Sequence, residues 1–357
     1  MARQWVLTGQ DGFETSLQYQ TGLSIPSKTD LAPNEVLVKM HAASLNYREL
    51  VIAGPMGING PITPPIVPGC DGAGTVEAIG SSVRDFQPGD RVLTHPAPRA
   101  VEARGDDAHA SMTEAVNALG QGDDGTLRSW AVFRESGLVH APKTLDWLSA
   151  ATLPCTWLTA WNALFGLDGK KAGPGSWVFV QGTGGVSVAA LQLAVAVGAT
   201  VVATTSTDEK ATRLTALGAK HVVNYRTNAK SWGEEARAFT PDGRGFDIVI
   251  DIGGNETLPH SLAAIRVDGV ILVVGHVGGT AEVVPLFAAM MHSCIVRGIL
   301  AGTRNQFREL VRFVDERGVV PVVDDVVFEL EEAKDAYRWL KEKRHFAKVV
   351  MRIEHEV

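Results

Sequence analysis

A glycine-rich turn between an apolar run and a helical pattern is the segment whose residue types and spacing are suited to binding a phosphate. Trp177 to Val180 is a short apolar run, and the turn Gly182-Thr183-Gly184-Gly185 follows it closely. Apolar residues then recur at helical spacing as far as Val197, and a β-branched run, Thr200 to Thr204, closes the segment. Strand, turn, helix and strand within about 30 residues are typical of a dinucleotide-binding βαβ unit.

The glycines of this turn explain how such a unit holds its ligand. Glycine lets the backbone turn sharply and approach a pyrophosphate, and the first N–H groups of the following helix point at the anion. The third glycine position of the motif is Ser187 here, which is still small enough for close helix–strand packing. The alternative is a glycine turn in some other α/β sheet. We expect the dinucleotide to contact Gly182, Thr183, Gly184, Gly185 and Val186.

The end of the second strand of this unit bears on which dinucleotide binds. NAD-preferring folds place an acid there for the ribose 2′-OH, whereas this chain has Thr204-Thr205-Ser206-Thr207. Ser206 can donate a hydrogen bond to a 2′-phosphate, and Lys210 supplies a positive charge one helical turn further on. Each also has a structural interpretation, as a helix N-cap and a solvated lysine. Together they favour NADP(H) over NAD(H).

Alternating strands and helices extend around the glycine turn and predict a complete doubly wound parallel sheet. The chain before it has β-branched and alternating runs, and the chain after it returns to a helix, a strand, a helix and a strand. We therefore expect a dinucleotide-binding domain, 156–300, inserted into a second domain formed by 1–155 and 301–357. The six predicted strands are 177–180, 200–204, 221–223, 246–252, 270–274 and 295–300.

Composition narrows the class of protein. A chain of 357 residues can form two domains with a large core, and its formal net charge of −7 argues against nucleic acid as a partner. The N-terminus lacks the apolar stretch of a secretory signal, and no apolar run is long enough to span a membrane. The three cysteines have no disulfide pattern, which predicts a reducing, cytoplasmic setting. The polar segment 96–126 is expected to be a long surface excursion.

Seven motifs resemble those of the medium-chain dehydrogenase/reductase superfamily over essentially the whole chain. They are AASLNYREL (42–50), PPIVPGCDGAGTVEAIG (64–80), FQPGDRV (86–92), LPCTWLTAWNAL (153–164), VQGTGGVSVAALQLA (180–194), GAKHVVNYR (218–226) and HFAKVV (345–350). The likeness is strongest to the zinc-independent, quinone-oxidoreductase-like and alcohol-dehydrogenase-like branch. It implies a GroES-like β-barrel catalytic domain, a Rossmann domain with a six-stranded doubly wound sheet, and a substrate cleft between them. It also implies a homodimer in which strand 295–300 pairs across a two-fold axis.

The resemblance also indicates where a catalytic metal would be held. Zinc-dependent relatives use a Cys in the first motif, a His in a Gly-His-Glu triplet and a Cys at the domain junction. This chain has Leu45-Asn46-Tyr47, Gly69-Cys70-Asp71 and Cys155 at those places, and 96–126 lacks the four cysteines of a structural zinc lobe. Two thiolates with Asp71 or Glu49 would make an unusual site. Because zinc takes about four ligands, we expect no metal and two ordinary semi-buried cysteines.

Without a metal, a side chain must stabilise the negative charge that develops on the substrate oxygen during hydride transfer. The resemblance places Tyr47 in the motif that meets the nicotinamide, so its phenol is the first candidate for proton donor. Asn46 is the expected orienting amide. Arg48 is an alternative electrostatic stabiliser, or else an ion-paired side chain. His95, which follows strand 91–94, is a further candidate for acid–base chemistry. The alternative is that it has only a structural role.

Further cofactor contacts follow from the resemblance alone. Tyr225 and Arg226 lie where NADPH-binding relatives contact the 2′-phosphate. The segment Gly275-His276-Val277 resembles the one that touches the nicotinamide, and Thr159 resembles a residue that packs beside the nicotinamide ring.

Three functions are compatible with these residues. The first is an NADPH-dependent, zinc-free reductase of a quinone or an activated C=C bond, acting on a small apolar or aromatic carbonyl compound. Trp130, Trp157 and Trp161 could line an aromatic cleft for such a substrate, or could equally be core residues. The second is a zinc-free NAD(P)-dependent alcohol or aldehyde dehydrogenase. The third is a non-catalytic NADPH-binding sensor or structural protein. None of them calls for a nucleic acid or a membrane partner.

Overall fold

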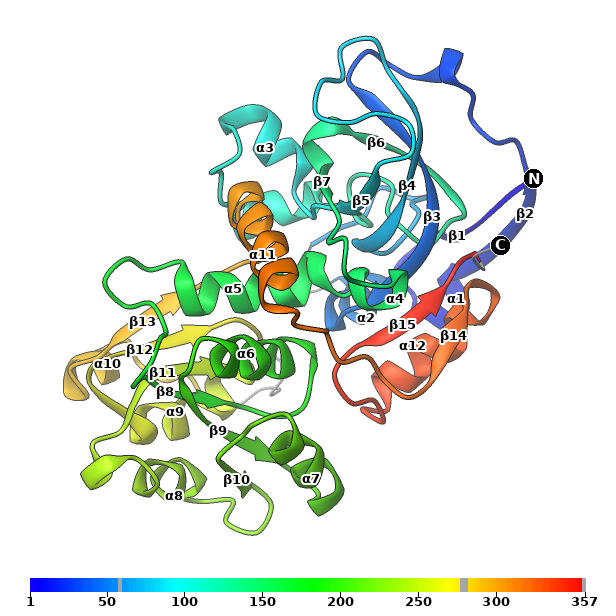
Figure 1. The fold of residues 1–357 in the computed structure, drawn as a ribbon. Coiled ribbons are helices and arrows are strands. Elements are labelled where there is room, and N and C mark those ends of the chain that lie inside the picture. Colours follow the sequence, from blue (N-terminus) through cyan, green and yellow to red (C-terminus); the bar gives the residue numbers. More distant parts are fainter. Residues whose placement is uncertain (57–59, 277–281, 355–357) are drawn as a thin grey trace. The chain divides into compact units, whose positions relative to one another are not determined.

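The chain folds into two compact units, each with its own sheet and apolar core. The computed structural model describes residues 1–56, 60–276 and 282–354 (Figure 1). The first unit comprises Met1–Leu158 and Ala301–Val357, and the second comprises Thr159–Leu300. The second unit is therefore an insertion between two stretches of the first.

A parallel six-stranded sheet forms the centre of the second unit (Figure 1). Numbered from its first strand, the order is 3-2-1-4-5-6, which is the order of a doubly wound dinucleotide-binding fold. The strands are apolar because helices cover both faces of such a sheet. The predicted Rossmann-like sheet is thus confirmed. The strands are β8 Trp177–Val180, β9 Thr200–Thr205, β10 His221–Asn224, β11 Phe246–Asp251, β12 Ile265–Val273 and β13 Ile295–Gly298.

Helices connect these strands. One of them, α8, was not expected, because its short sequence WGEEARA has no clear apolar periodicity. It packs on α9, where Trp232 stacks on His260 with ring centroids 4.1 Å apart. Strand β12 begins five residues earlier than expected, because Arg266 and Asp268 interrupt the apolar pattern in its first part. The helices are α5 Leu158–Phe165, α6 Gly185–Ala196, α7 Asp208–Ala216, α8 Trp232–Ala238, α9 Leu258–Ala264 and α10 Phe287–Met291, with 3-10 turns at Pro241–Gly243 and Gly254–Glu256.

A seven-stranded mixed sheet, together with a two-stranded one, forms the first unit. Both ends of the chain contribute, because β15 pairs antiparallel with β3. This confirms that the chain is of the α/β class; closure of the sheet into a barrel stays a prediction. The strands are β1 Ala2–Leu7, β2 Leu17–Leu23, β3 Glu35–Leu45, β4 Asp71–Ile79, β5 Arg91–Thr94, β6 Trp130–Arg134, β7 Leu138–His140, β14 Val327–Glu329 and β15 Val349–Arg352.

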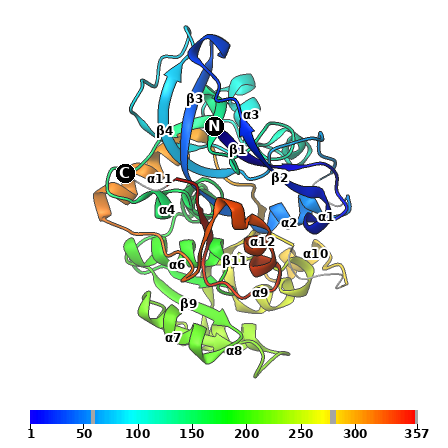
Figure 2. The same ribbon diagram turned by 90° about the vertical axis from the view of Figure 1, so that its right-hand side faces the viewer.

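Three helices of the first unit, α1, α2 and α12, pack against one another (Figure 2). The expected surface excursion, 96–126, is not a simple loop, since it contains α3 and a 3-10 helix and buries Ala100, Val101 and Leu119. The α-helices are α1 Phe13–Ser16, α2 Tyr47–Ala53, α3 Pro98–Arg104, α4 Trp147–Ala150, α11 Arg304–Arg317 and α12 Ala333–Lys341. A π-helical turn spans Leu153–Trp157, and 3-10 turns span Lys28–Asp30, Met112–Asn117, Glu135–Gly137 and Leu330–Glu332.

Within the described ranges, none of the helices has both the length and the apolar character that crossing a membrane requires.

Candidate functional site

The predicted catalytic motif lies where β3 ends and α2 begins. Asn46 is the N-cap of α2, and its backbone N–H donates to Glu49 Oε2 at 2.7 Å. This capping box fixes the chain reversal between strand and helix. Asn46 is buried, while Tyr47, at the first position of the helix, remains 46% exposed. Tyr47 is therefore accessible to a ligand, as a proton donor must be.

Arg48 is engaged inside the first unit. Its Nη1 lies 3.0 Å from Glu49 Oε1 and 3.1 Å from the carbonyl oxygen of Leu119. Arg48 is thus ion-paired, which is one of the two alternatives that the sequence allowed for it. It ties α2 to the segment 96–126, so the geometry favours a structural role for Arg48 over contact with substrate.

Lys348, just before β15, is the central residue of this region that sequence reasoning missed. Its side chain is 2% exposed, and it forms a buried ion pair with Asp71 at 2.9 Å. Its Nζ also lies 2.6 Å from Asn46 Oδ1 and 2.8 Å from the carbonyl oxygen of Leu45. Three acceptors thus serve three N–H groups, the condition under which a buried charge is tolerated. A lysine within the apolar run FAKVVM was the available signal.

Asp71, at the start of β4, is equally occupied. The Ser44 hydroxyl lies 2.9 Å from its Oδ2, the oxygen that also accepts from Lys348. The Cys70 thiol donates to its Oδ1 at 3.4 Å. Both carboxylate oxygens therefore already have partners within the first unit.

Cys70, Asp71 and Cys155 bring possible metal-ligating atoms within 4.8 Å of one another. The hydrogen bond with Cys155, together with burial and the nearby Asp71 carboxylate, raises the pKa of Cys70 well above its usual value. Its thiol therefore stays protonated at neutral pH. Zinc requires about four ligands, with cysteine as thiolate. Only three such groups lie together here, and the Asp71 carboxylate is already bound to the Lys348 ammonium, so this donor set does not fit a resident zinc ion.

His95, Trp157 and Trp161 are buried, as expected for residues with a structural role. Burial lowers the pKa of His95 to about 4, and its Nε2 lies 3.2 Å from the carbonyl oxygen of Gly302. The ring is thus a neutral, buried hydrogen-bonding group at physiological pH. Trp157 and Trp161 are buried in the core, whereas Trp130 is half-buried on β6.

The glycine turn of the second unit has the geometry of a phosphate cradle. Gly182 has φ 75°, a left-handed conformation that glycine adopts readily, and its N–H donates to Thr204 Oγ1 at 2.9 Å. Ser187 donates to the carbonyl oxygen of Gln181 at 2.6 Å, so the serine fastens the turn to the helix. Gly184 is the N-cap of α6 and gives no side-chain cap. The first N–H groups of α6 therefore lack a side-chain acceptor, which fits a dinucleotide pyrophosphate.

The residues expected near the 2′-phosphate lie at one edge of the same sheet. Thr207 is the N-cap of α7, and its hydroxyl oxygen accepts from the Lys210 backbone N–H at 3.3 Å. Ser206 is therefore not the N-cap, which was its alternative structural role. Tyr225 follows β10, and its N–H donates to the Thr205 carbonyl at 3.1 Å. Because β10 pairs in register with β9, Ser206 and Tyr225 leave the sheet side by side. The Tyr225 side chain is largely exposed.

The segment after β12 is supported by a polar network that the sequence did not predict. Asp251 accepts from the Gly254 N–H at 2.9 Å and from the Ser261 hydroxyl at 2.5 Å, and Gln181 donates to Ser261 at 2.7 Å. Gly254 approaches His276 so closely that an added Cβ would lie 2.6 Å from His276 Nδ1. The network therefore fixes the loop beside the expected nicotinamide segment.

The four residues expected near the nicotinamide are not all described by the structure. Gly275 and His276 follow β12, as expected from the sequence. Val277 lies outside the described residues. Thr159 is buried in α5.

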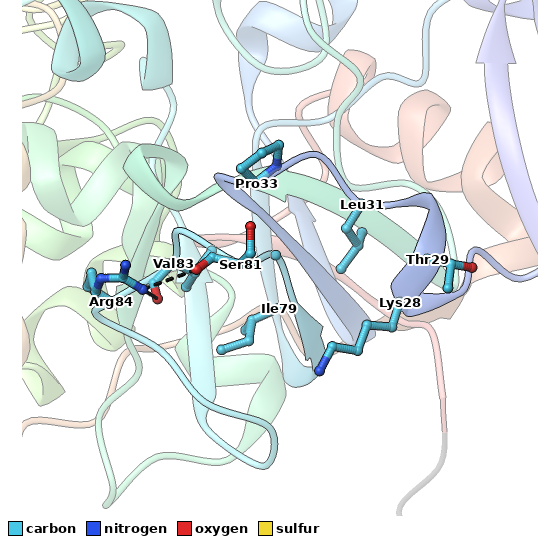
Figure 3. A pocket seen from close by; sticks show the side chains of 9 residues that line it. Lys28, Thr29, Leu31, Pro33, Ile79, Ser81, Val83 and Arg84 are labelled. Carbon is cyan, nitrogen blue, oxygen red and sulfur yellow. Dashed lines mark hydrogen bonds between the residues drawn. The ribbon is translucent and has the colours of Figure 1, made fainter.

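A surface hollow of about 580 Å³ lies in the first unit (Figure 3). It lies between the turn at Lys28 and the segment after β4, where Arg84 donates to the Ser81 and Val83 carbonyls. Neither the predicted catalytic motif nor the cysteines line it.

Two family descriptions match the chain. The alcohol dehydrogenase GroES-like domain matches residues 32–143, and the zinc-binding dehydrogenase domain matches residues 185–316. A zinc-type alcohol dehydrogenase-like protein of Schizosaccharomyces pombe is 40% identical over 92% of this chain and 93% of its own length. A quinone oxidoreductase of Sus scrofa is 28% identical, covering 90% of this chain and 88% of its own. The solved structure of an NAD-dependent alcohol dehydrogenase matches with a TM-score of 0.84 at 32% identity, covering 99% of this chain and 100% of that chain.

Proposed function

Because the chain belongs to the medium-chain dehydrogenase/reductase superfamily and is an NAD(P)-dependent oxidoreductase, we propose that it is a zinc-free, NADPH-dependent reductase. Its substrate in this proposal is a quinone or an activated C=C bond of a small apolar or aromatic carbonyl compound. Membership of this superfamily implies a nicotinamide cofactor; the choice of NADPH and the absence of zinc are parts of the proposal. The cytoplasm, where three free cysteines stay reduced, is the proposed location.

The observation that carries the zinc-free proposal is the buried ammonium of Lys348. It lies 2.9 Å from Asp71 Oδ2, so the carboxylate nearest the two cysteines is already neutralised by a cation of the chain itself. A second cation in this region would have to displace a complete set of hydrogen bonds.

Tyr47 is the proposed proton donor. Its phenol is the accessible member of the motif, and Asn46 beside it is buried and fixed. Reduction of the substrate would build negative charge on its oxygen, and the Tyr47 phenol, positioned there, could donate a proton to it. The cofactor supplies the hydride when bound.

NADPH is favoured by the edge formed by Ser206, Lys210 and Tyr225. Two hydroxyl groups and one ammonium come from this edge, and acids follow only in the first turn of α7, where they interact favourably with the helix dipole. A 2′-phosphate therefore meets donors rather than a carboxylate.

An alcohol or aldehyde dehydrogenase is the second candidate, because relatives at 40% and 32% identity carry alcohol dehydrogenase names. The same phenol would serve a C=O bond. Product analysis separates the two candidates, since a quinol or saturated ketone indicates the first and an alcohol indicates the second.

The test is the oxidation of NADPH and of NADH with a panel of quinones, enones, aldehydes and ketones, using protein analysed for metal. We expect turnover with NADPH, no stoichiometric zinc, and a loss of kcat of about 100-fold or more in Tyr47→Phe. Tyr19→Phe, which removes a phenol from β2, is the matched control and should keep wild-type rates. Stoichiometric zinc, or an unchanged kcat in Tyr47→Phe, would refute the proposed site.

A homodimer formed through the second unit is also part of the proposal. Strand β13 lies at the edge of the six-stranded sheet, and α10 just before it exposes a group of apolar side chains. An unpaired edge strand beside an apolar surface is suited to pairing with a second copy.

A further inference from the structure

The Lys348 ammonium, just before β15, is held by acceptors at the ends of two neighbouring strands, β3 and β4. The Leu45 carbonyl comes from β3, Asp71 begins β4, and Lys348 itself precedes β15. The three oxygen atoms lie 2.8 Å, 2.6 Å and 2.9 Å from Nζ for Leu45, Asn46 and Asp71 respectively. Because these strands are neighbours in one sheet, the position of the ammonium is fixed by the sheet itself.

This position determines which end of the Asn46 amide points where. An ammonium group carries donors and no acceptor, so the atom that faces it must be Oδ1. The opposite orientation would direct two N–H groups at a positive charge. Consequently the amide nitrogen faces away from Lys348, toward Cys70 Sγ at 3.6 Å.

We propose that Lys348 is a positioning residue that holds Asn46 as a hydrogen-bond donor toward the reacting oxygen of the substrate. This inference rests on the proposed function. Among the described residues, the amide nitrogen has the weak acceptor Cys70 Sγ as its hydrogen-bond partner. The amide therefore has one N–H group left. This N–H group and the Tyr47 phenol can together stabilise the negative charge on the substrate oxygen.

Lys348 acts through Asn46 and does not itself touch substrate. All three of its N–H groups are used, and its side chain is 2% exposed. Asp71 compensates its charge, so the pair orients a neutral amide without adding net charge. Removing Lys348 would leave Asp71 unpaired in the core and free the Asn46 amide to rotate.

The first test separates positioning from simple stability. Lys348→Met should lower kcat about 10- to 100-fold with little change in KM, because a misplaced donor weakens the transition state. It should also lower the unfolding midpoint, since it leaves a buried unpaired carboxylate. The double variant Lys348→Met with Asp71→Asn removes that charge and should recover stability but not kcat. Lys39→Met, a surface lysine on β3, should match the wild type. Recovery of kcat together with stability would overturn the proposal.

The second test needs no substrate and so is independent of the proposed function. Protein labelled with ¹⁵N at asparagine should show slowly exchanging side-chain N–H signals for Asn46, identified by their loss in Asn46→Ser. Exchange should become fast in the double variant while other asparagine signals persist. Unchanged exchange refutes the positioning role. If the labelled protein behaves as expected but turns over no quinone or enone, only the proposed function fails.

Discussion

At the scale of single residues, His95 shows how burial sets a protonation state. Burial lowers its pKa to about 4, while the hydrogen bond to the Gly302 carbonyl opposes this. An unfolded chain takes up a proton near pH 6.5, whereas the folded chain does so near pH 4. The folded state is therefore the less protonated one between these values, and its stability falls as the pH is lowered through this window.

We expect about 3 kcal/mol of unfolding free energy to be lost through His95 between pH 7 and pH 4. Denaturant unfolding at a series of pH values would measure this for the wild type and for His95→Gln, whose amide can still donate to Gly302. The glutamine does not titrate, so its stability should decline less steeply over the same range. If the unfolding free energies of the wild type and His95→Gln depended on pH in the same way, the lowered pKa of His95 would be contradicted.

The residues that sequence reasoning missed share one property. Lys348 and Asp71 are 277 positions apart, and Gln181 and Ser261 are 80 apart, so their contacts exist only once the sheets have formed. A motif indicates which residue types are present, but not which partner neutralises a buried charge. Tyr47 and the glycine turn could be proposed from the sequence because the arguments for them depend on local spacing, and their roles stay predictions.

At the scale of elements, the glycine turn and α6 together form the proposed pyrophosphate site. Gly182 needs a left-handed backbone, whereas Gly184 has φ −79° and serves as an N-cap without a side chain. A Cβ on Gly184 would meet no atom within 4 Å. The two glycines therefore serve different purposes, one for folding the turn and one for leaving the helix N–H groups open.

Substitutions should separate these purposes. Gly182→Ala should destabilise the protein by about 1–2 kcal/mol because alanine disfavours the left-handed conformation. Gly184→Ser should keep stability, since serine is a good N-cap, but its hydroxyl would bond the N–H groups that the pyrophosphate needs. Its NADPH affinity should fall about tenfold or more, measured by fluorescence titration alongside denaturant unfolding. Wild-type affinity in Gly184→Ser would place the phosphates elsewhere.

Element boundaries could be predicted where apolar runs are continuous. Strands β8, β9 and β10 begin where expected because nothing polar interrupts them. Helix α8 and the helices within 96–126 escaped prediction because they are short and have at most three buried residues each. Their stability comes from tertiary contacts such as the stacking of Trp232 on His260, which local propensity does not contain.

At the scale of the whole molecule, one apolar surface of the second unit has no partner among the described residues. Helix α10 and the residues before it expose a set of large apolar side chains, and β13 follows at the sheet edge. Such a cluster is unusual for a monomer, whereas isolated exposed apolar residues are common. The exposed side chains are Val283, Leu286, Phe287, Met290 and Met291.

A second copy of the chain is the expected occupant of this surface, because a two-fold axis beside β13 would pair two identical edge strands and bury both apolar clusters. We therefore expect the wild type to be dimeric by light scattering and the variant Leu286→Glu with Met290→Glu to be monomeric, since each buried interface would have to accept four unpaired carboxylates. Val320→Glu changes an exposed apolar residue of the first unit, 58% exposed, and should remain dimeric. A wild-type monomer, or a dimer that survives both glutamates, would mean that this surface serves another purpose. Loss of the dimer with NADPH affinity retained would show that the cofactor site is complete within one chain.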